Sequence, residues 1–250
     1  MKSLKISGCI IMFCALLSLS AVAQNDTLFV YGPGGPFGPI NECAQVFGRH
    51  HNITIKVTAG PEANWIVQAK KNADLIYGGA EYMLTQFEIK HNNLVNKNTR
   101  TELFKRGAAI LIRPGNPKNI HSFDDLTRSG INILDINGAG QFGLWEDIAG
   151  KQNLIGGIQK NIKQSFINTA LGIEAWKRDS SYDAWITYYS WHVRLKDITQ
   201  SVKIPSAINV YRGTPIALTT ITKQAELCSL FISYMKSTAG HTIFKKWGWE

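Results

Sequence analysis

Apolar positions along this chain alternate between two spacings almost from one end to the other. Short continuous or alternating apolar runs, such as residues 28–31 and 53–57, are followed by stretches in which apolar residues recur every three or four positions. The first pattern is typical of strands and the second of helices with one buried face. Strands that alternate with helices predict an α/β protein with largely parallel sheets.

The predicted elements follow one another without an internal repeat or a low-complexity tract. Strands are expected at residues 28–31, 53–57, 73–77, 108–112, 131–136, 183–189, 207–211 and 215–221. Helices are expected at residues 40–47, 63–71, 81–91, 142–148 and 225–235, with a short closing helix at 243–249. The region that ends at Arg178 has a helical or mixed pattern, and Ser122 with Asp125 predicts a capped helix start.

Three predicted strands end in glycine-rich turns that lead into helices. These turns contain residues 32–36, 78–79 and 138–140. Glycine leaves the backbone N–H groups unobstructed, and at the N-terminus of a helix these groups carry partial positive charge. Since ligands of open α/β sheets bind at the C-terminal ends of the strands, the turns predict a site for a small anion.

The first 23 residues have the features of a secretory signal peptide. Lys2 and Lys5 precede an apolar stretch at residues 10–19, and small residues follow at 21–23. We therefore expect cleavage after Ala23 and a soluble, unanchored protein in the periplasm.

The charge of the chain indicates which partners it favours. The 27 Lys and Arg against 18 Asp and Glu give a net charge of +9, which favours anions. No dense basic run accompanies it, so nucleic acid is not expected as a partner.

Outside the signal only Cys43 and Cys228 remain, and they either form a disulfide or stay as buried thiols. We expect no cofactor and a monomeric protein.

Four short segments, residues 30–36, 58–61, 183–187 and 244–249, carry a family resemblance. Through them the chain resembles the type II periplasmic solute-binding proteins, within these the molybdate- and sulfate-binding branch, and most of all the accessory colonization factor AcfC group. The resemblance implies a two-lobed α/β fold in which each lobe is a sheet flanked by helices and the chain crosses between lobes twice. Residues 24–107 and 205–250 would form the first lobe and residues 108–204 the second.

The resemblance also implies that an anion lies in the cleft between the lobes and is held by uncharged donors, without a counter-charge. The residues expected to bind it are Gly34, Gly35, Pro36, Gly60, Pro61, Gly79, Ala80, Glu81, Gly140, Gln141, Asn168 and Tyr188. Gly140 matches a helix start, Asn168 a backbone donor and Tyr188 a phenol donor. The first two loops lack the serines that molybdate-binding relatives use, which weakens the case for molybdate.

Two groups of side chains have more than one interpretation. Glu81 would repel an ionised anion if it lined the cleft, unless the ligand carried a proton or an amine. Its alternative role is that of a favourable acid in the first turn of a helix. The large aromatic residues Trp65, Tyr82, Trp145 and Trp191 could either wall the cleft or pack in the core.

Two other functions have partial support in the sequence. Tyr188 and Tyr189 resemble the paired tyrosines of type II ferric-binding proteins, although adjacent strand residues point to opposite faces. Gly138, Gly140 and Gly143 have the spacing of a dinucleotide-binding fingerprint, but no acid follows about 20 residues later. No nucleophile elbow or catalytic histidine set is evident.

The main prediction is therefore a binding protein and not an enzyme. It would capture sulfate, another tetrahedral oxyanion or a small carboxylate and present it to an ABC transporter permease or a chemoreceptor. The AcfC resemblance points to a role in colonisation and chemotaxis.

Overall fold

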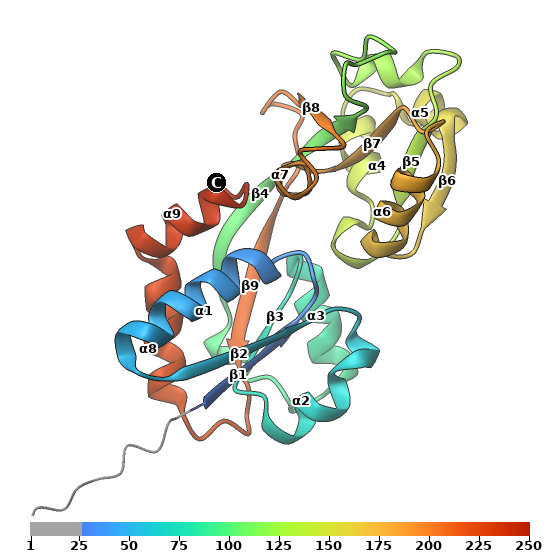
Figure 1. Ribbon diagram of the computed structural model, residues 1–250. Coiled ribbons are helices and arrows are strands. Elements are labelled where there is room, and N and C mark those ends of the chain that lie inside the picture. Colours follow the sequence, from blue (N-terminus) through green and yellow to red (C-terminus); the bar gives the residue numbers. More distant parts are fainter. Residues whose placement is uncertain (1–26) are drawn as a thin grey trace, which may run out of the picture.

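The computed structural model describes residues 27–250, so the signal peptide predicted at 1–23 lies outside the described residues. Figure 1 shows two lobes connected by the long strands β4 (Thr101–Ile112) and β9 (Tyr211–Leu218). Within the described residues, no helix is both long and apolar enough to cross a bilayer.

The first lobe contains a mixed sheet. β1 (Thr27–Gly32) lies between β2 (Thr54–Ala59) and β3 (Leu75–Tyr77) and runs parallel to both. β9 pairs antiparallel with β3 and then with the first half of β4. In β1 the side chains of Leu28 and Val30 are completely buried, as the apolar pattern of the sequence predicts.

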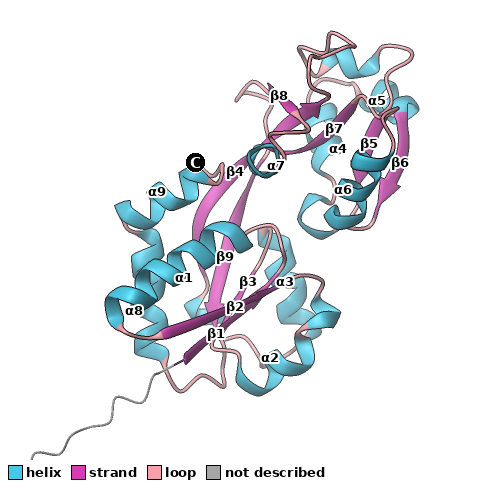
Figure 2. Ribbon diagram, in the orientation of Figure 1, coloured by secondary structure: helices cyan, strands magenta, loops and turns pink. Residues whose placement is uncertain are grey.

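Helices cover both faces of this sheet (Figure 2). α1 (Phe37–His51), α8 (Ala225–Lys236) and α9 (Thr238–Lys246) bury their apolar sides in one hydrophobic cluster. α2 (Ile66–Asn72) and α3 (Glu81–Lys90) form a second cluster with other strand residues. The predicted helical stripes therefore point at the sheet.

The second lobe is built in the same way. β5 (Ile133–Ile136) runs parallel to β6 (Ile162–Phe166) and β7 (Ala184–Tyr188), while β7 and β8 (Gln200–Lys203) pair antiparallel with the second half of β4. The helices of this lobe are α4 (Leu144–Gly150), α5 (Ile155–Asn161), α6 (Thr169–Arg178) and α7 (Tyr189–Arg194). Its own hydrophobic cluster includes the fully buried side chains of Trp176 and Trp185.

β4 is shared by both lobes. It pairs with β9 up to Gly107, opposite Tyr211, and with β7 from Ala108, opposite Tyr188. The strand order is β2-β1-β3-β9-β4-β7-β5-β6, with β8 also on β4. The sheet is therefore mixed, and the prediction of largely parallel sheets is correct only for the outer strands. The antiparallel pairs all involve β4 or β9, the two strands that cross between the lobes.

Several predicted elements differ from those observed. Of the strand expected at residues 207–211, only Tyr211 belongs to a strand, because residues 207–210 form a turn and an irregular segment. β9 begins at Tyr211 and contains residues 215–218 of the strand expected at 215–221, and β6, β8 and the first half of β4 were not predicted. Ser122 and Asp125 do form a reciprocal capping pair, in which the Asp125 carboxylate accepts from the Ser122 N–H at 2.9 Å. The pair starts only the 3-10 turn Asp124–Thr127.

Cys43 and Cys228 are free, buried thiols. They belong to the hydrophobic cluster beneath α1 and α8. Of the two alternatives for these cysteines, the structure has the buried thiols.

Candidate functional site

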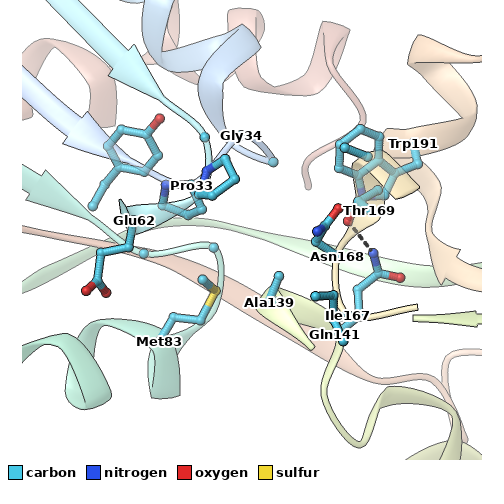
Figure 3. Close-up of a pocket in the computed structure, with 18 of the residues that line it drawn as sticks. Pro33, Gly34, Glu62, Met83, Ala139, Gln141, Ile167, Asn168, Thr169 and Trp191 are labelled. Carbon is cyan, nitrogen blue, oxygen red and sulfur yellow. Dashed lines mark hydrogen bonds between the residues drawn. The ribbon is translucent and has the colours of Figure 1, made fainter. Parts of the chain in front are cut away.

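A cavity of about 530 Å³ lies between the two lobes. One side is formed by the loops that follow β1, β2 and β3, and the other by the turn after β5 and the start of α6. Figure 3 shows the open space with Pro33, Gly34, Glu62 and Met83 on one side and Ala139, Gln141, Ile167, Asn168 and Thr169 on the other.

Most of the residues predicted to bind the ligand line this cavity. They are Gly34, Gly35, Gly60, Pro61, Gly79, Gly140, Gln141 and Asn168. These residues come from five separate segments of the sequence, and the structure brings them together at one place.

Helix N-termini approach the cavity from both lobes. Gly34 and Gly35 lie just before α1, and Gly79 lies two residues before α3. Asn168 is the N-cap of α6, and its Oδ1 accepts a hydrogen bond from the N–H of Leu171 at 3.0 Å. The partial positive charges of three helix dipoles therefore face the same space, which favours a negative ligand.

Gly140 is not at a helix start, contrary to the prediction. It lies in the 3-10 turn Ala139–Gln141, and α4 begins only at Leu144. A β-carbon on Gly140 would be 2.9 Å from the carbonyl oxygen of Gly79 in the other lobe. Glycine is therefore needed here because the two backbones approach closely. The spacing of Gly138, Gly140 and Gly143 does not form a dinucleotide-binding helix start.

Four predicted residues do not line the cavity. Pro36 is the N-cap of α1, and Ala80 is fully buried as the N-cap of α3. Glu81 accepts a hydrogen bond from the N–H of Gly213 at 2.7 Å through its Oε1. The Tyr188 hydroxyl donates to the carbonyl oxygen of Gly140 at 2.5 Å. The polar groups of Glu81 and Tyr188 are thus engaged within the protein.

Arg106 lines the cavity and was not predicted. Its side chain is on β4, and the residue is 2% exposed. Nη2 donates to the carbonyl oxygen of Gly79 at 2.7 Å, and the guanidinium lies 4.0 Å from the Tyr188 ring and 5.3 Å from the Trp249 ring. Among residues 27–250, Nε and Nη1 have no hydrogen-bond partner.

A buried guanidinium without a carboxylate is energetically unfavourable unless other groups stabilise it. The two aromatic rings contribute cation–π attraction, and burial lowers the pKa of Arg106 although the group remains ionised. Arg106 therefore supplies a positive charge with unused donors at the cavity wall. The expectation that only uncharged donors line the cleft is wrong.

Little in the sequence distinguishes Arg106 from the other basic residues. Lys105 and Arg106 form one of several scattered basic pairs, and the segment before residue 108 was not predicted as a strand. In a strand, adjacent side chains point to opposite faces. Lys105 is accordingly exposed while Arg106 is buried.

The wall formed by the second lobe adds polar groups. Gln141 Nε2 donates to the Thr169 hydroxyl at 2.9 Å, and its buried Oε1 has no partner among the described residues. Arg194 on α7 lies over the Trp191 ring at 4.4 Å and donates to the Gly34 carbonyl at 3.2 Å. A second guanidinium therefore lies at the cavity and bridges the lobes.

Among residues 27–250, Glu62 is the one carboxylate that lines the cavity. It accepts hydrogen bonds from Lys90 Nζ and His91 Nε2, each at 2.8 Å. Although burial opposes it, these two hydrogen bonds lower the pKa of Glu62. Its negative charge is therefore balanced by its own neighbours.

The paired tyrosines considered for iron point in different directions. Tyr188 is fully buried at the end of β7, and this burial raises the pKa of its phenol. Tyr189 is the first residue of α7 and is 45% exposed. Neither lines the cavity. In the part of the chain that the structure describes, no group of three or more His, Cys, Asp and Glu could hold a metal ion.

Comparisons with known proteins agree with this architecture. The sequence model of a family described as bacterial extracellular solute-binding proteins matches residues 28–250. No curated protein sequence matches the chain.

Similar solved structures include PEB3 in complex with L-phospholactate, at 29% identity and a TM-score of 0.82, covering 89% of this chain and 99% of that one. PEB3 from Campylobacter jejuni matches at 29% identity and a TM-score of 0.80, with the same coverage. The sulfate-binding protein SubI from Mycobacterium tuberculosis matches at 17% identity and a TM-score of 0.73, covering 89% of this chain and 86% of that one.

Proposed function

The chain belongs to the bacterial extracellular solute-binding proteins, and we propose that it captures a small anion in the cavity between its lobes. Its fold is that of type II periplasmic binding proteins. Family members and structural neighbours of this kind are binding proteins and not enzymes.

The observation that carries the proposal is the state of Arg106. Its guanidinium is buried at the cavity, and two of its nitrogens have no partner within residues 27–250. Hydrogen bonds between a guanidinium and a carboxylate or phosphate are stronger than those between neutral groups. The N-termini of α1, α3 and α6 lie around the same space and add partial positive charge.

Phosphate and carboxylate groups are the anions that this arrangement suits best. A guanidinium offers two parallel N–H donors, which match the paired oxygens of these groups. The complex of the similar protein PEB3 with L-phospholactate supports this choice. Sulfate and other tetrahedral oxyanions place their acceptor oxygens as phosphate does, so the proposal includes them.

The proposal includes closure of the lobes around the ligand. Residues 24–107 and 205–250 would move against residues 108–204, and contacts present only in the closed form would shift the population toward it. The closed protein would then be recognised by an ABC transporter permease or a chemoreceptor. Membership of the AcfC group would favour the chemoreceptor.

Substitution of Arg106 tests the proposal directly. In Arg106→Gln the anion would lose a buried charge-assisted contact. We expect the binding free energy to weaken by about 2–5 kcal/mol, which raises the dissociation constant at least about thirtyfold. The measurement is isothermal titration of the purified protein with sulfate, inorganic phosphate and L-phospholactate.

Lys105→Gln is the matched control, because it removes the same charge from the exposed face of the same strand. We expect its affinity to stay within about twofold of the original, since an exposed charge contributes little. Equal affinities in Arg106→Gln and Lys105→Gln would contradict the proposal.

A further inference from the structure

The part of the cavity wall that the first lobe forms next to Arg106 is lined mainly by apolar side chains. We call it the apolar chamber and define it by Trp65, Tyr77, Met83, Leu84 and Phe87, all of which line the cavity. Trp65, Tyr77, Leu84 and Phe87 are buried. In Figure 3, Met83 points from its helix toward the open space.

The apolar chamber begins next to the guanidinium of Arg106. A β-carbon on Gly79 would be 3.1 Å from Met83 Sδ and 3.7 Å from Arg106 Nη2. The two side chains therefore flank the same glycine. An acid group held by Arg106 would have its remaining atoms within reach of the apolar chamber.

The chamber presents almost no polar group of its own. The indole N–H of Trp65 donates to the Gly60 carbonyl at 3.1 Å, so this nitrogen is already bonded. The Trp65 and Phe87 rings lie side by side with centroids 5.7 Å apart. The exception is the Tyr77 hydroxyl, which is buried and has no hydrogen-bond partner among the residues that the structure describes.

Size and polarity together select the class of ligand. Cavities that hold organic ligands measure about 300–1,000 Å³ and have mostly apolar walls with a few polar groups, and the 530 Å³ cavity falls in this range. An inorganic oxyanion has no apolar surface with which to cover Met83 and Phe87. An organic acid would bury apolar area against them, which stabilises the complex.

We propose that the ligand is an organic acid whose carboxylate or phosphate binds Arg106 and whose apolar body fills the apolar chamber. A hydrogen-bond acceptor on that body would meet the Tyr77 hydroxyl. This inference rests on the proposed function and adds the chemical class of the ligand.

Two matched pairs of probes test the inference by isothermal titration. The pairs are inorganic phosphate with phenyl phosphate and acetate with phenylacetate. Both members of a pair carry a phosphoryl group or a carboxylate, and only the second member carries an aromatic body. We expect the aromatic member of at least one pair to bind at least about tenfold more tightly than the small one, because it buries additional apolar surface.

Met83→Gln keeps the length of the side chain and makes it polar. We expect it to weaken the aromatic probe at least about threefold and the small probe less than about twofold. Ile89→Gln makes a similar change on the same helix at a position that is 73% exposed, and it should change neither affinity.

The outcomes separate this inference from the proposed function. If phosphate binds as tightly as phenyl phosphate, acetate as tightly as phenylacetate, and Arg106→Gln weakens all of them, the inference is wrong and the proposed function stands. If none of these four probes binds, the inference is wrong, and the proposed function is wrong as well when sulfate and L-phospholactate also fail to bind. A preference for the aromatic probes that Met83→Gln leaves unchanged would also contradict the inference.

Discussion

At the scale of single residues, the glycines around the cavity make room for Arg106 as well as exposing backbone N–H groups. A β-carbon on Gly35 would be 3.0 Å from Arg106 Nη1, and one on Gly140 would be 3.1 Å from Nη2. These distances are tighter than ordinary van der Waals contacts. The glycine-rich turns therefore belong to the same arrangement as the arginine, although only the turns were evident in the sequence.

The C-terminal residues also support Arg106. Trp249 lies under the guanidinium and donates from its indole N–H to the Thr214 hydroxyl at 2.9 Å. Trp247 donates to the Glu42 carboxylate at 2.7 Å and so fixes the same segment to α1. The segment 244–249, noted as a mark of family resemblance, thus has a physical role at the site.

Tyr188→Phe tests whether the phenol binds ligand or supports the site. The structure places its hydroxyl on the Gly140 carbonyl, so removal leaves a buried acceptor unpaired. We expect the free energy of unfolding in urea to fall by about 1–3 kcal/mol. The ring remains beneath Arg106, and affinity for inorganic phosphate should change less than about fivefold. Lost binding with unchanged stability would instead support the phenol donor predicted from the sequence.

At the scale of elements, strong periodic patterns predicted most helices and strands, and weak patterns did not. α1 and α8 were evident because their apolar residues recur at helical spacing and lie buried on the sheet. The first half of β4 contains Glu102, Lys105 and Arg106. These charged residues interrupt the apolar pattern by which a strand is predicted, although Arg106 is buried in the folded protein. β6, with three consecutive exposed positions, lacks a buried run.

The packing of α1 and α8 predicts that Cys43 and Cys228 are unreactive in the folded protein. Burial raises the pKa of each thiol to about 12, whereas an unfolded cysteine titrates near about 8.5. At pH 8 we expect no alkylation by iodoacetamide in buffer and modification of both residues in urea, as measured by mass spectrometry.

The same shift has a pH dependence that can be checked. Because both folded pKa values are raised, the unfolded state loses protons first, and these thiols destabilise the folded state progressively as the pH rises from about 8.5 to about 12. Cys43→Ser should reduce this pH dependence. Rapid alkylation of the native protein at pH 8 would show that the helices do not bury the thiols.

At the scale of the whole molecule, polar side chains of one lobe form hydrogen bonds and an ion pair with the other lobe. Arg212 of β9 forms an ion pair with Asp147 of α4 at 2.5 Å. The Tyr82 hydroxyl donates to the Ala139 carbonyl at 2.5 Å and accepts from the Phe142 N–H at 3.0 Å. These contacts join residues of opposite lobes, as expected of contacts that stabilise a closed form.

Tyr82→Phe should therefore weaken ligand binding by favouring the open form. Loss of two hydrogen bonds of about 0.5–1.5 kcal/mol each predicts an affinity reduced by about fivefold or more for a ligand that binds the closed protein. Titration calorimetry measures the affinity, and small-angle X-ray scattering should show a larger radius of gyration. Tyr189→Phe, at an exposed tyrosine on α7, serves as the control and should leave both quantities unchanged. An unaltered affinity in Tyr82→Phe would show that these contacts do not limit closure.

By itself the sequence determined the α/β class, most helices and strands, the glycine turns and the prediction of an anion. These features depend on the spacing of apolar residues and on the N–H groups of glycine turns. Both are set by residues that are close together in the sequence. Only the tertiary structure decided that the charge of Arg106 lies at the cavity, that Glu81 and Tyr188 bond within the protein, and that Trp249 and Tyr188 lie beside the guanidinium. The physical reason is that the burial and pairing of a side chain depend on strands and termini far apart in the sequence.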